Sequence, residues 1–311
     1  QLVLEGRAVQ KNLKMGKKAK TVEDINKSFA KLMLQGKVNA ALRLLDESSD
    51  NGGVLQLSDE VLNELKRKHP HAAEVDESVL IQGDLPFFDP SIFMNIDESS
   101  IAKAALRTKG AGGPSAMDAD GWKHMLVNRN YGPASKDLRD SIARMARKLA
   151  SEHVCSASIE SYLSCRLIPL DKMPGVRPIG IGEVLRRIIG KAIIEIIKPQ
   201  IVESAGPLQL CAGQKAGCEA AIHAMTEMFA HEDTDAVLLV DAENAFNSIN
   251  RKVLLHNIRF LCPSIATYTI NCYIQPSRLF IQGGKEIQSA EGTTQGDAIA
   301  HLRYWGYAID D

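Results

Sequence analysis

The sequence has no long apolar run, and its longest runs fall far short of the roughly 20 residues that a membrane-spanning helix needs. We therefore expect no membrane partner. The chain also opens without the charged and then apolar pattern of a signal peptide. These absences predict an intracellular protein, cytoplasmic or nuclear. Because the first residue is Gln1, we expect a fragment or a processed piece of something longer.

The six cysteines lack the spacing of a zinc site. No two of them form a CxxC motif, and no histidine lies at zinc-finger spacing from them. The eight histidines form neither a catalytic triad nor an HExxH motif, so hydrolytic and zinc chemistry have no support. Buried thiols in a reduced intracellular protein are the simpler interpretation.

The chain has almost no net charge, −1 at pH 7, which by itself argues against a nucleic-acid-binding protein. The charges are unevenly distributed, however. Residues 1–20 and 101–200 are basic, whereas residues 21–100 and 201–311 are acidic. This separation suits an enzyme that binds phosphates with one part and metal ions with another. A solvated helix face would give the same pattern.

Composition divides the chain into three parts. Residues 1–20 are predicted to be a basic, mobile tail. Residues 21–100 predict a helical N-terminal region, with helices at 24–45 and 57–68 and an irregular linker that contains prolines at 69–90.

The remainder, residues 101–311, mixes helical and strand patterns. The helices that we expect span 136–153, 184–201, 218–231, 250–261 and 264–274. Strands are expected on both sides of Pro174-Gly175 and on both sides of Gly283-Gly284, each pair forming a hairpin. This mixture predicts an α+β fold in which helices back an antiparallel sheet.

Residues 236–247, with the sequence AVLLVDAENAFN, join an apolar run to a carboxylate and an aromatic ring. An apolar run of about five residues without a helical stripe predicts a buried strand at 236–240. Asp241 at its end can hold a hard divalent cation, and Phe246 can form the floor of a pocket beside it. Taken alone, a helix cap at Asp241 and a core position for Phe246 are the more common roles.

Two further segments change this interpretation, residues 167–182 (LIPLDKMPGVRPIGIG) and residues 291–297 (EGTTQGD). In this order the three segments resemble the conserved motifs of reverse transcriptases: the basic fingers hairpin, the first catalytic aspartate and the glutamine–glycine turn. The resemblance is greatest to retrotransposon polymerases and runs roughly over residues 111–300. Upstream, residues 113–122 resemble the segment that precedes the fingers in many retroelement polymerases, with a template-side or structural role.

The resemblance implies that residues 101–311 form the fingers and partial palm of a right-hand polymerase. Such an enzyme, an RNA-directed DNA polymerase and hence a nucleotidyltransferase, transfers a nucleotide from a dNTP to the 3′-hydroxyl of a DNA primer on an RNA template. It uses two metal ions, Mg²⁺ or Mn²⁺, which hold the attacking and leaving oxygens. Asp241 would be the first carboxylate ligand, and the Ala242 carbonyl would also face a metal. Phe246 would exclude a 2′-hydroxyl from the sugar pocket.

The resemblance also assigns residues that bind the nucleotide. Arg177 matches the arginine that grips the triphosphate, and Lys172 across the turn would assist it. Gln295 and Gly296 match the turn beside the nascent base pair, where glycine lets the backbone approach closely. For Asp297 the simpler interpretation, independent of the resemblance, is a cap of the following helix, since Asp is a favoured N-cap residue.

Three cations recur on the next expected helix, Arg186, Arg187 and Lys191. The resemblance implies that they track template or primer phosphates through contacts that do not depend on sequence and weaken with salt. A solvated or ion-paired helix face explains them equally well.

The family's second acidic motif is irregular here. The family motif is an aromatic residue, any one residue and then two aspartates, and Asp310 and Asp311 resemble these aspartates, with Asp310 as a metal ligand. Here two residues instead of one follow Tyr307, and Asp310 comes only 15 positions after Gln295. Either the chain is cut within the helix after the turn, or a deletion has brought the motif forward. We prefer truncation, with the thumb and downstream domains of a longer polyprotein missing.

Two alternatives stay open. One is a catalytically dead remnant that keeps the fold and binds nucleic acid. The other is an RNA-templated RNA polymerase, against which Phe246 argues because such enzymes usually keep a smaller or polar group to admit ribose.

Overall fold

The computed structural model describes most of the chain. The described residues are 22–36, 38, 41, 53–172, 174–206, 209, 216–238, 243–281, 283–294 and 296–297. They fall into two compact units, Gln1–Leu55 and Gln56–Asp311.

In the first unit the structure describes one long helix, α2 (Val22–Leu34). Its exposed face carries an ion pair one turn apart, with Lys27 Nζ 2.8 Å from Glu23 Oε1. The chain leaves the helix through Gly36, whose φ of +68° suits a residue without a side chain. This confirms the predicted helix start and the predicted break at Gly36.

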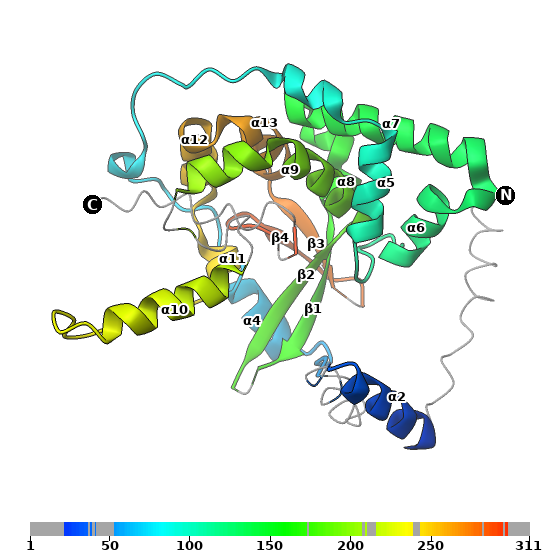
Figure 1. Cartoon of the computed structure of the whole chain (residues 1–311), viewed down its shortest axis with the longest axis horizontal. Helices are drawn as coiled ribbons and strands as arrows, with labels where there is room; N and C mark the ends of the chain where they lie inside the picture. The colour runs from blue at the N-terminus through cyan, green and yellow to red at the C-terminus, as the bar shows by residue number, and fades with distance from the viewer. Residues whose placement is uncertain are drawn as a thin grey trace. The chain divides into compact units, whose positions relative to one another are not determined.

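The second unit is built around a four-stranded sheet in the order β2-β1-β3-β4 (Figure 1). Its strands are β1 (Cys165–Asp171), β2 (Val176–Gly182), β3 (Ser277–Ile281) and β4 (Glu286–Ser289). Both predicted hairpins are confirmed as antiparallel pairs. The central pair, β1 with β3, is parallel, because the chain crosses through several helices before it returns. The sheet is therefore mixed, and the prediction of an antiparallel sheet is wrong for the β1–β3 pair.

Helices make up most of the second unit, and together with the sheet they give the predicted α+β class. The long ones are α4 (Asp59–Arg67), α5 (Glu98–Arg107), α6 (Ala119–Val127), α7 (Gly132–Ser151), α9 (Val184–Ala205), α10 (Gly217–Phe229), α12 (Arg251–Leu261) and α13 (Pro263–Tyr273). Short helical turns are η1 (Glu77–Val79), η2 (Pro90–Asn95), η3 (Arg129–Tyr131), η4 (Ser156–Ile159), α8 (Glu160–Leu163) and α11 (Ala245–Ser248). Among the described residues, no helix is both long and apolar enough to cross a membrane.

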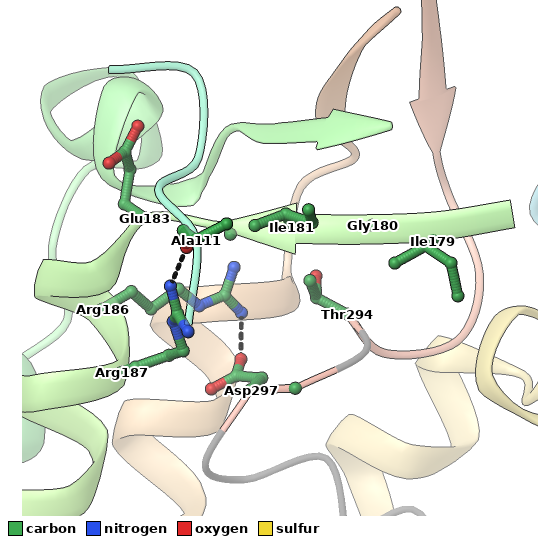
Figure 2. A pocket seen from close by; sticks show the side chains of 11 residues that line it. Ala111, Ile179, Gly180, Ile181, Glu183, Arg186, Arg187, Thr294 and Asp297 are labelled. Atoms are coloured by element: carbon green, nitrogen blue, oxygen red, sulfur yellow. Dashed lines mark hydrogen bonds and ion pairs between the residues drawn. The ribbon is translucent and has the colours of Figure 1, made fainter. Parts of the chain in front are cut away.

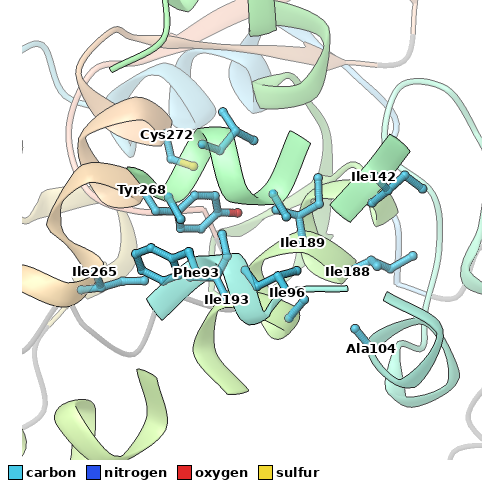
Figure 3. Packing of buried hydrophobic residues seen from close by; sticks show 14 of the residues in the cluster. Phe93, Ile96, Ala104, Ile142, Ile188, Ile189, Ile193, Ile265, Tyr268 and Cys272 are labelled. Atoms are coloured by element: carbon cyan, nitrogen blue, oxygen red, sulfur yellow. The ribbon is translucent and has the colours of Figure 1, made fainter. Parts of the chain in front are cut away.

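The main hydrophobic core lies between α5, α7, α9 and α13 (Figure 3). Aliphatic side chains from α9 meet Tyr268 of α13 and Phe93 of η2, all of them buried. This helical core supports the end of the β1–β2 hairpin at which α9 begins.

The predicted buried strand at 236–240 is wrong for the residues that the structure describes. Residues 236–238 form no strand, and Leu238 is 86% exposed. Residues 239 and 240 lie outside the described part. An apolar run makes burial favourable, but a buried strand also needs a neighbouring strand and a covering layer, and no described strand pairs with 236–238.

Candidate functional site

A cavity of about 240 Å³ lies where β2, the start of α9 and residues 294–297 meet (Figure 2). Its walls are partly apolar and partly charged. The lining residues are Ala111, Ile179, Gly180, Ile181, Gly182, Glu183, Arg186, Arg187, Thr294, Gly296 and Asp297. Two of the three motif segments, residues 167–182 and residues 291–297, thus contribute residues to one cavity.

The turn is anchored by a buried ion pair between Asp297 and Arg186. Arg186 Nη2 lies 2.6 Å from Asp297 Oδ2, and each side chain is 1% exposed. The Tyr273 hydroxyl donates a hydrogen bond of 2.7 Å to the same carboxylate oxygen and accepts one of 3.2 Å from the Thr294 amide. Because buried charges need partners, these contacts fix the turn to α9 and α13. Asp297 therefore pairs with an arginine, a role that the sequence did not predict.

Two members of this cluster, Arg186 and Tyr273, stay protonated at neutral pH. Burial by itself lowers the pKa of Arg186, but the Asp297 carboxylate together with Tyr273, Cys272 and Cys165 outweighs burial, and the pKa lies well above its ordinary value. Burial is also the main reason that the pKa of Tyr273 is raised well above its ordinary value. Tyr273 therefore remains a hydrogen-bond donor to Asp297.

A second buried arginine, Arg251, holds the strand that leads into the turn. It lies in the first turn of α12, and its guanidinium donates to the carbonyls of Ser289, Glu291 and Gly292 at 2.8, 2.9 and 3.1 Å. Burial lowers the pKa of Arg251 to about 10, so it stays charged at neutral pH. Arg251 thus fixes the backbone before the cavity.

The third motif segment reaches the same place through backbone hydrogen bonds. The Thr293 amide donates to the Phe246 carbonyl at 2.6 Å, and the Gly292 amide donates to the Ile249 carbonyl at 2.8 Å. Gly292 has a φ of +68°, and its backbone packs so closely on Phe246 that a side chain has no room. On its other side the turn reaches β1, where Thr294 Oγ1 lies 3.8 Å from Cys165 Sγ. All three segments therefore converge on residues 291–297.

The upstream segment, residues 113–122, binds a residue that lines the cavity. The Ser115 amide and hydroxyl donate to the two carboxylate oxygens of Glu183 at 2.7 and 2.6 Å. Glu183 is the residue that precedes α9 and lines the cavity. These contacts show a structural role for Ser115, as one of the two roles expected for its segment.

The predicted phosphate ligands Lys172 and Arg177 lie at the outer end of the β1–β2 hairpin, and both are exposed. Their turn closes through the Lys172 amide, which donates to the Gly175 carbonyl at 3.0 Å, and Gly175 has a φ of +106°. Both cations are therefore available to an anionic ligand.

The cations of α9 face the protein rather than solvent to different degrees. Arg186 is fully buried, so its prediction as a nucleic-acid contact does not fit this structure. Arg187 donates to the carbonyls of Lys109 and Ala111, and Lys191 donates to the Arg107 carbonyl at 2.9 Å. Burial lowers the pKa of both Arg187 and Lys191. These two residues hold the loop whose Ala111 lines the cavity.

Several predicted site residues lie outside the described part of the chain, so the structure does not place them. They are Asp241, Ala242, Gln295, Asp310 and Asp311. The described residues contain none of the predicted metal ligands, and no three acidic, histidine or cysteine side chains among them are grouped to hold a metal ion.

Sequence reasoning missed the residues that hold the site together. Tyr273 sits in a helix whose pattern indicates only core, and Arg251 follows Asn250, which caps α12. Glu291 belongs to a recognised motif, but the motif gave it no role. The one available signal was a charged residue on an apolar helix face, as Arg186 is among its isoleucine neighbours.

No model of a known protein family matches the sequence, and no curated protein is found to be similar to it. The proposed function therefore rests on the three motif segments and on their arrangement.

Proposed function

We propose that the chain is the fingers and partial palm of a retrotransposon-type RNA-directed DNA polymerase. The reaction is nucleotidyl transfer from a dNTP to a primer 3′-hydroxyl on an RNA template. The observation that supports this most is that residues 291–294 and 296–297 meet both other segments: they share a cavity with residues 179–182 of the hairpin, and their backbone binds Phe246 and Ile249. Nothing in their sequence spacing requires contact between them, whereas a polymerase site built from these three motifs does.

The predicted nucleotide-binding residues that the structure describes each have a role in this proposal. Arg177 and Lys172, exposed on the hairpin, bind the triphosphate through charge-assisted hydrogen bonds. Gly296 lines the cavity and lets a base pair approach the backbone. Phe246, which is half-buried, lies under the sugar and excludes a 2′-hydroxyl.

The metal chemistry is assigned by resemblance alone. Asp241, the Ala242 carbonyl and Asp310 would hold Mg²⁺ or Mn²⁺, which stabilises the negative charge on the attacking and leaving oxygens. Asp311 completes the acidic motif.

The exposure of the three α9 cations decides which of them we propose as contacts to the template or primer. Arg187 and Lys191 are half-buried, so a template or primer phosphate can reach them while they hold the 107–111 loop. Arg186 is not proposed as a contact, because its charge is committed to Asp297 in the interior.

The test is primer extension on an RNA template with Mg²⁺ and dNTPs. The chain is compared with Asp241→Asn, which keeps the shape and removes the charge, and with Asp235→Asn, which changes a nearby exposed carboxylate. Extension that is lost only in Asp241→Asn supports the proposal. Binding of primer–template at low salt without extension supports the dead remnant instead. A chain that neither extends the primer nor binds primer–template would contradict both the polymerase and the remnant.

A further inference from the structure

Residues 68–82, which we call the strap, cross from the end of α4 to the region before η2. The sequence predicts them to be part of an irregular linker, and apart from η1 they have no helix or strand. Their backbone is nevertheless bound by side chains from 244–257 and from residue 291. The contacts are Asn244 Nδ2 to Lys68 O at 2.8 Å, Ala73 N to Glu291 Oε1 at 2.7 Å, Ile81 N to Asn257 Oδ1 at 3.1 Å, Asn257 Nδ2 to Val79 O at 3.0 Å, and His256 Nε2 to Ile81 O at 2.9 Å.

These contacts are specific because an irregular segment has no neighbouring strand or helical turn to satisfy its amides and carbonyls. In the five contacts above, each strap amide or carbonyl is bonded to a single side chain, which must hold one position and orientation to make the bond. Asn257, which has no exposed surface, both accepts from the strap and donates to it. A linker that only connected two parts would be hydrated instead.

Asn244 joins the strap to the segment that carries Phe246. Its φ of +54° is left-handed, a conformation that asparagine adopts more readily than most residues. Its amide nitrogen donates to Lys68 O, and its amide oxygen accepts from Asn247 Nδ2 at 2.9 Å. Because the Thr293 amide binds the Phe246 carbonyl, residues 244–247 are bound both to the strap and to the turn.

Glu291 makes the second connection, which joins the strap to the motif turn. Its side chain is buried, and each carboxylate oxygen accepts one backbone amide, from Ala73 at 2.7 Å and from Arg251 at 2.5 Å. One carboxylate thus links the strap, the start of α12 and the motif turn. The nearby Arg251 guanidinium, which donates to the Glu291 carbonyl, offsets the buried negative charge.

We propose that Asn244 and Glu291 are positioning residues, which use the strap to fix the backbone under Phe246 and so set the discrimination between deoxyribose and ribose. The part that concerns the sugar rests on the proposed polymerase function. The part that concerns the backbone does not. On this proposal residues 68–82 belong to the site and do not merely precede it.

The test uses two variants that each remove one connection. Asn244→Asp loses the donor to Lys68 O but keeps the acceptor for Asn247 and tolerates the left-handed conformation. Glu291→Gln keeps the shape but can accept only one of its two amides. The matched control is Asp76→Asn, because Asp76 lies in the strap and caps only η1 through Ser78. Hydrogen exchange and the ratio of dNTP to rNTP incorporation efficiency are measured on the whole chain.

In both variants we expect exchange to rise about fivefold in residues 69–82 and in residues 243–250 together, which is the effect of losing one ordinary hydrogen bond. The dNTP to rNTP ratio should fall by a similar factor, whereas a general loss of stability would lower both efficiencies equally. The control should change exchange only at η1. If Glu291→Gln does not fold, Asn244→Asp decides alone, since Asn244 is only half-buried.

Two results would separate the proposals. If Asn244→Asp speeds exchange in 243–250 but leaves the strap unchanged, the positioning role is wrong. If the parent chain extends no primer but the coupled exchange is seen, the polymerase function fails and the connection through the strap stands.

Discussion

Arg186 of α9 and Asp297 of the motif turn form an ion pair of 2.6 Å in which each side chain is only 1% exposed. The pair joins α9, the helix that follows the β1–β2 hairpin, to the motif turn at the cavity (Figure 2). Tyr273 binds the same carboxylate and packs its ring 4.9 Å from the Arg186 guanidinium carbon. The wall of the cavity thus depends on charges that solvent does not reach.

Replacing Asp297 by asparagine should strongly destabilise the protein. Asp297→Asn leaves the buried Arg186 without a counter-charge, and removing one partner of a buried pair costs about 3–5 kcal/mol. The free energy of unfolding, measured in urea, should fall by that amount. The matched control is Glu195→Gln, which removes an exposed pair with Arg107 and should cost less than about 1 kcal/mol. Equal losses in the two variants would contradict the importance of burial.

A methyl group at Gly292 should separate the turn from the Phe246 segment. An added Cβ would overlap the Phe246 carbonyl oxygen and lie within 2.5 Å of Asn247 Cα, in a conformation with φ +68°. We expect Gly292→Ala to cost about 3 kcal/mol or more, since overlap adds to backbone strain. Gly284→Ala is the control, because Gly284 has φ +83° and open space around it, so only strain of about 1–2 kcal/mol applies. Thermal unfolding of both variants measures the difference.

Acidification should destabilise the start of the strap through His69. His69 is partly buried and bonds through Nδ1 to the Leu65 carbonyl at 2.8 Å, and burial lowers its pKa below the ordinary 6.5. The unfolded chain therefore binds a proton first, and stability is lost as the pH falls below about 6.5. The loss from this group cannot exceed about 1.4 kcal/mol per pH unit.

The pH dependence is measured as the unfolding free energy between about pH 7.5 and about pH 5, a range that spans the ordinary histidine pKa. His69→Gln should flatten the curve in this range, and His71→Gln, at an exposed position, should leave it unchanged. A curve that is equally steep without His69 would assign the effect to other groups.

Replacing Arg177, the exposed arginine of the hairpin, should lower the efficiency of nucleotide incorporation without changing the stability of the fold. Arg177→Ala is expected to reduce dNTP incorporation efficiency by about 10- to 100-fold, the value of charge-assisted hydrogen bonds to phosphate. Its unfolding midpoint should not change, because Arg177 is exposed. Arg144→Ala, which removes an exposed arginine bonded only locally to Ser141, serves as the control and should leave efficiency unchanged. Equal effects would indicate general electrostatics.

Local patterns predicted the local structure well. The helices α7, α9, α12 and α13 and both hairpins lie where periodicity and turn residues place them, to within a few residues. These features depend on neighbours along the chain: side-chain spacing sets the buried face of a helix, and Gly175, Gly283 and Gly284 adopt the positive φ angles that their turns need. The strand predicted at 236–240 is not found at residues 236–238, the part that the structure describes, because burial of a strand depends on a partner elsewhere.

The sequence alone determined the α+β class, the positions of most helices and hairpins, and the three motif segments, because each depends on residues near one another in the chain. Only the tertiary structure decided that β1 pairs with β3 in parallel, that Arg186 turns inward to Asp297, and that residues 68–82 bind Asn244 and Glu291. These contacts join residues far apart in sequence, and their partners are single side chains with no periodic pattern. A charge that is buried and paired has the same letter as one in solvent, so its role is settled only when the fold brings its partner to it.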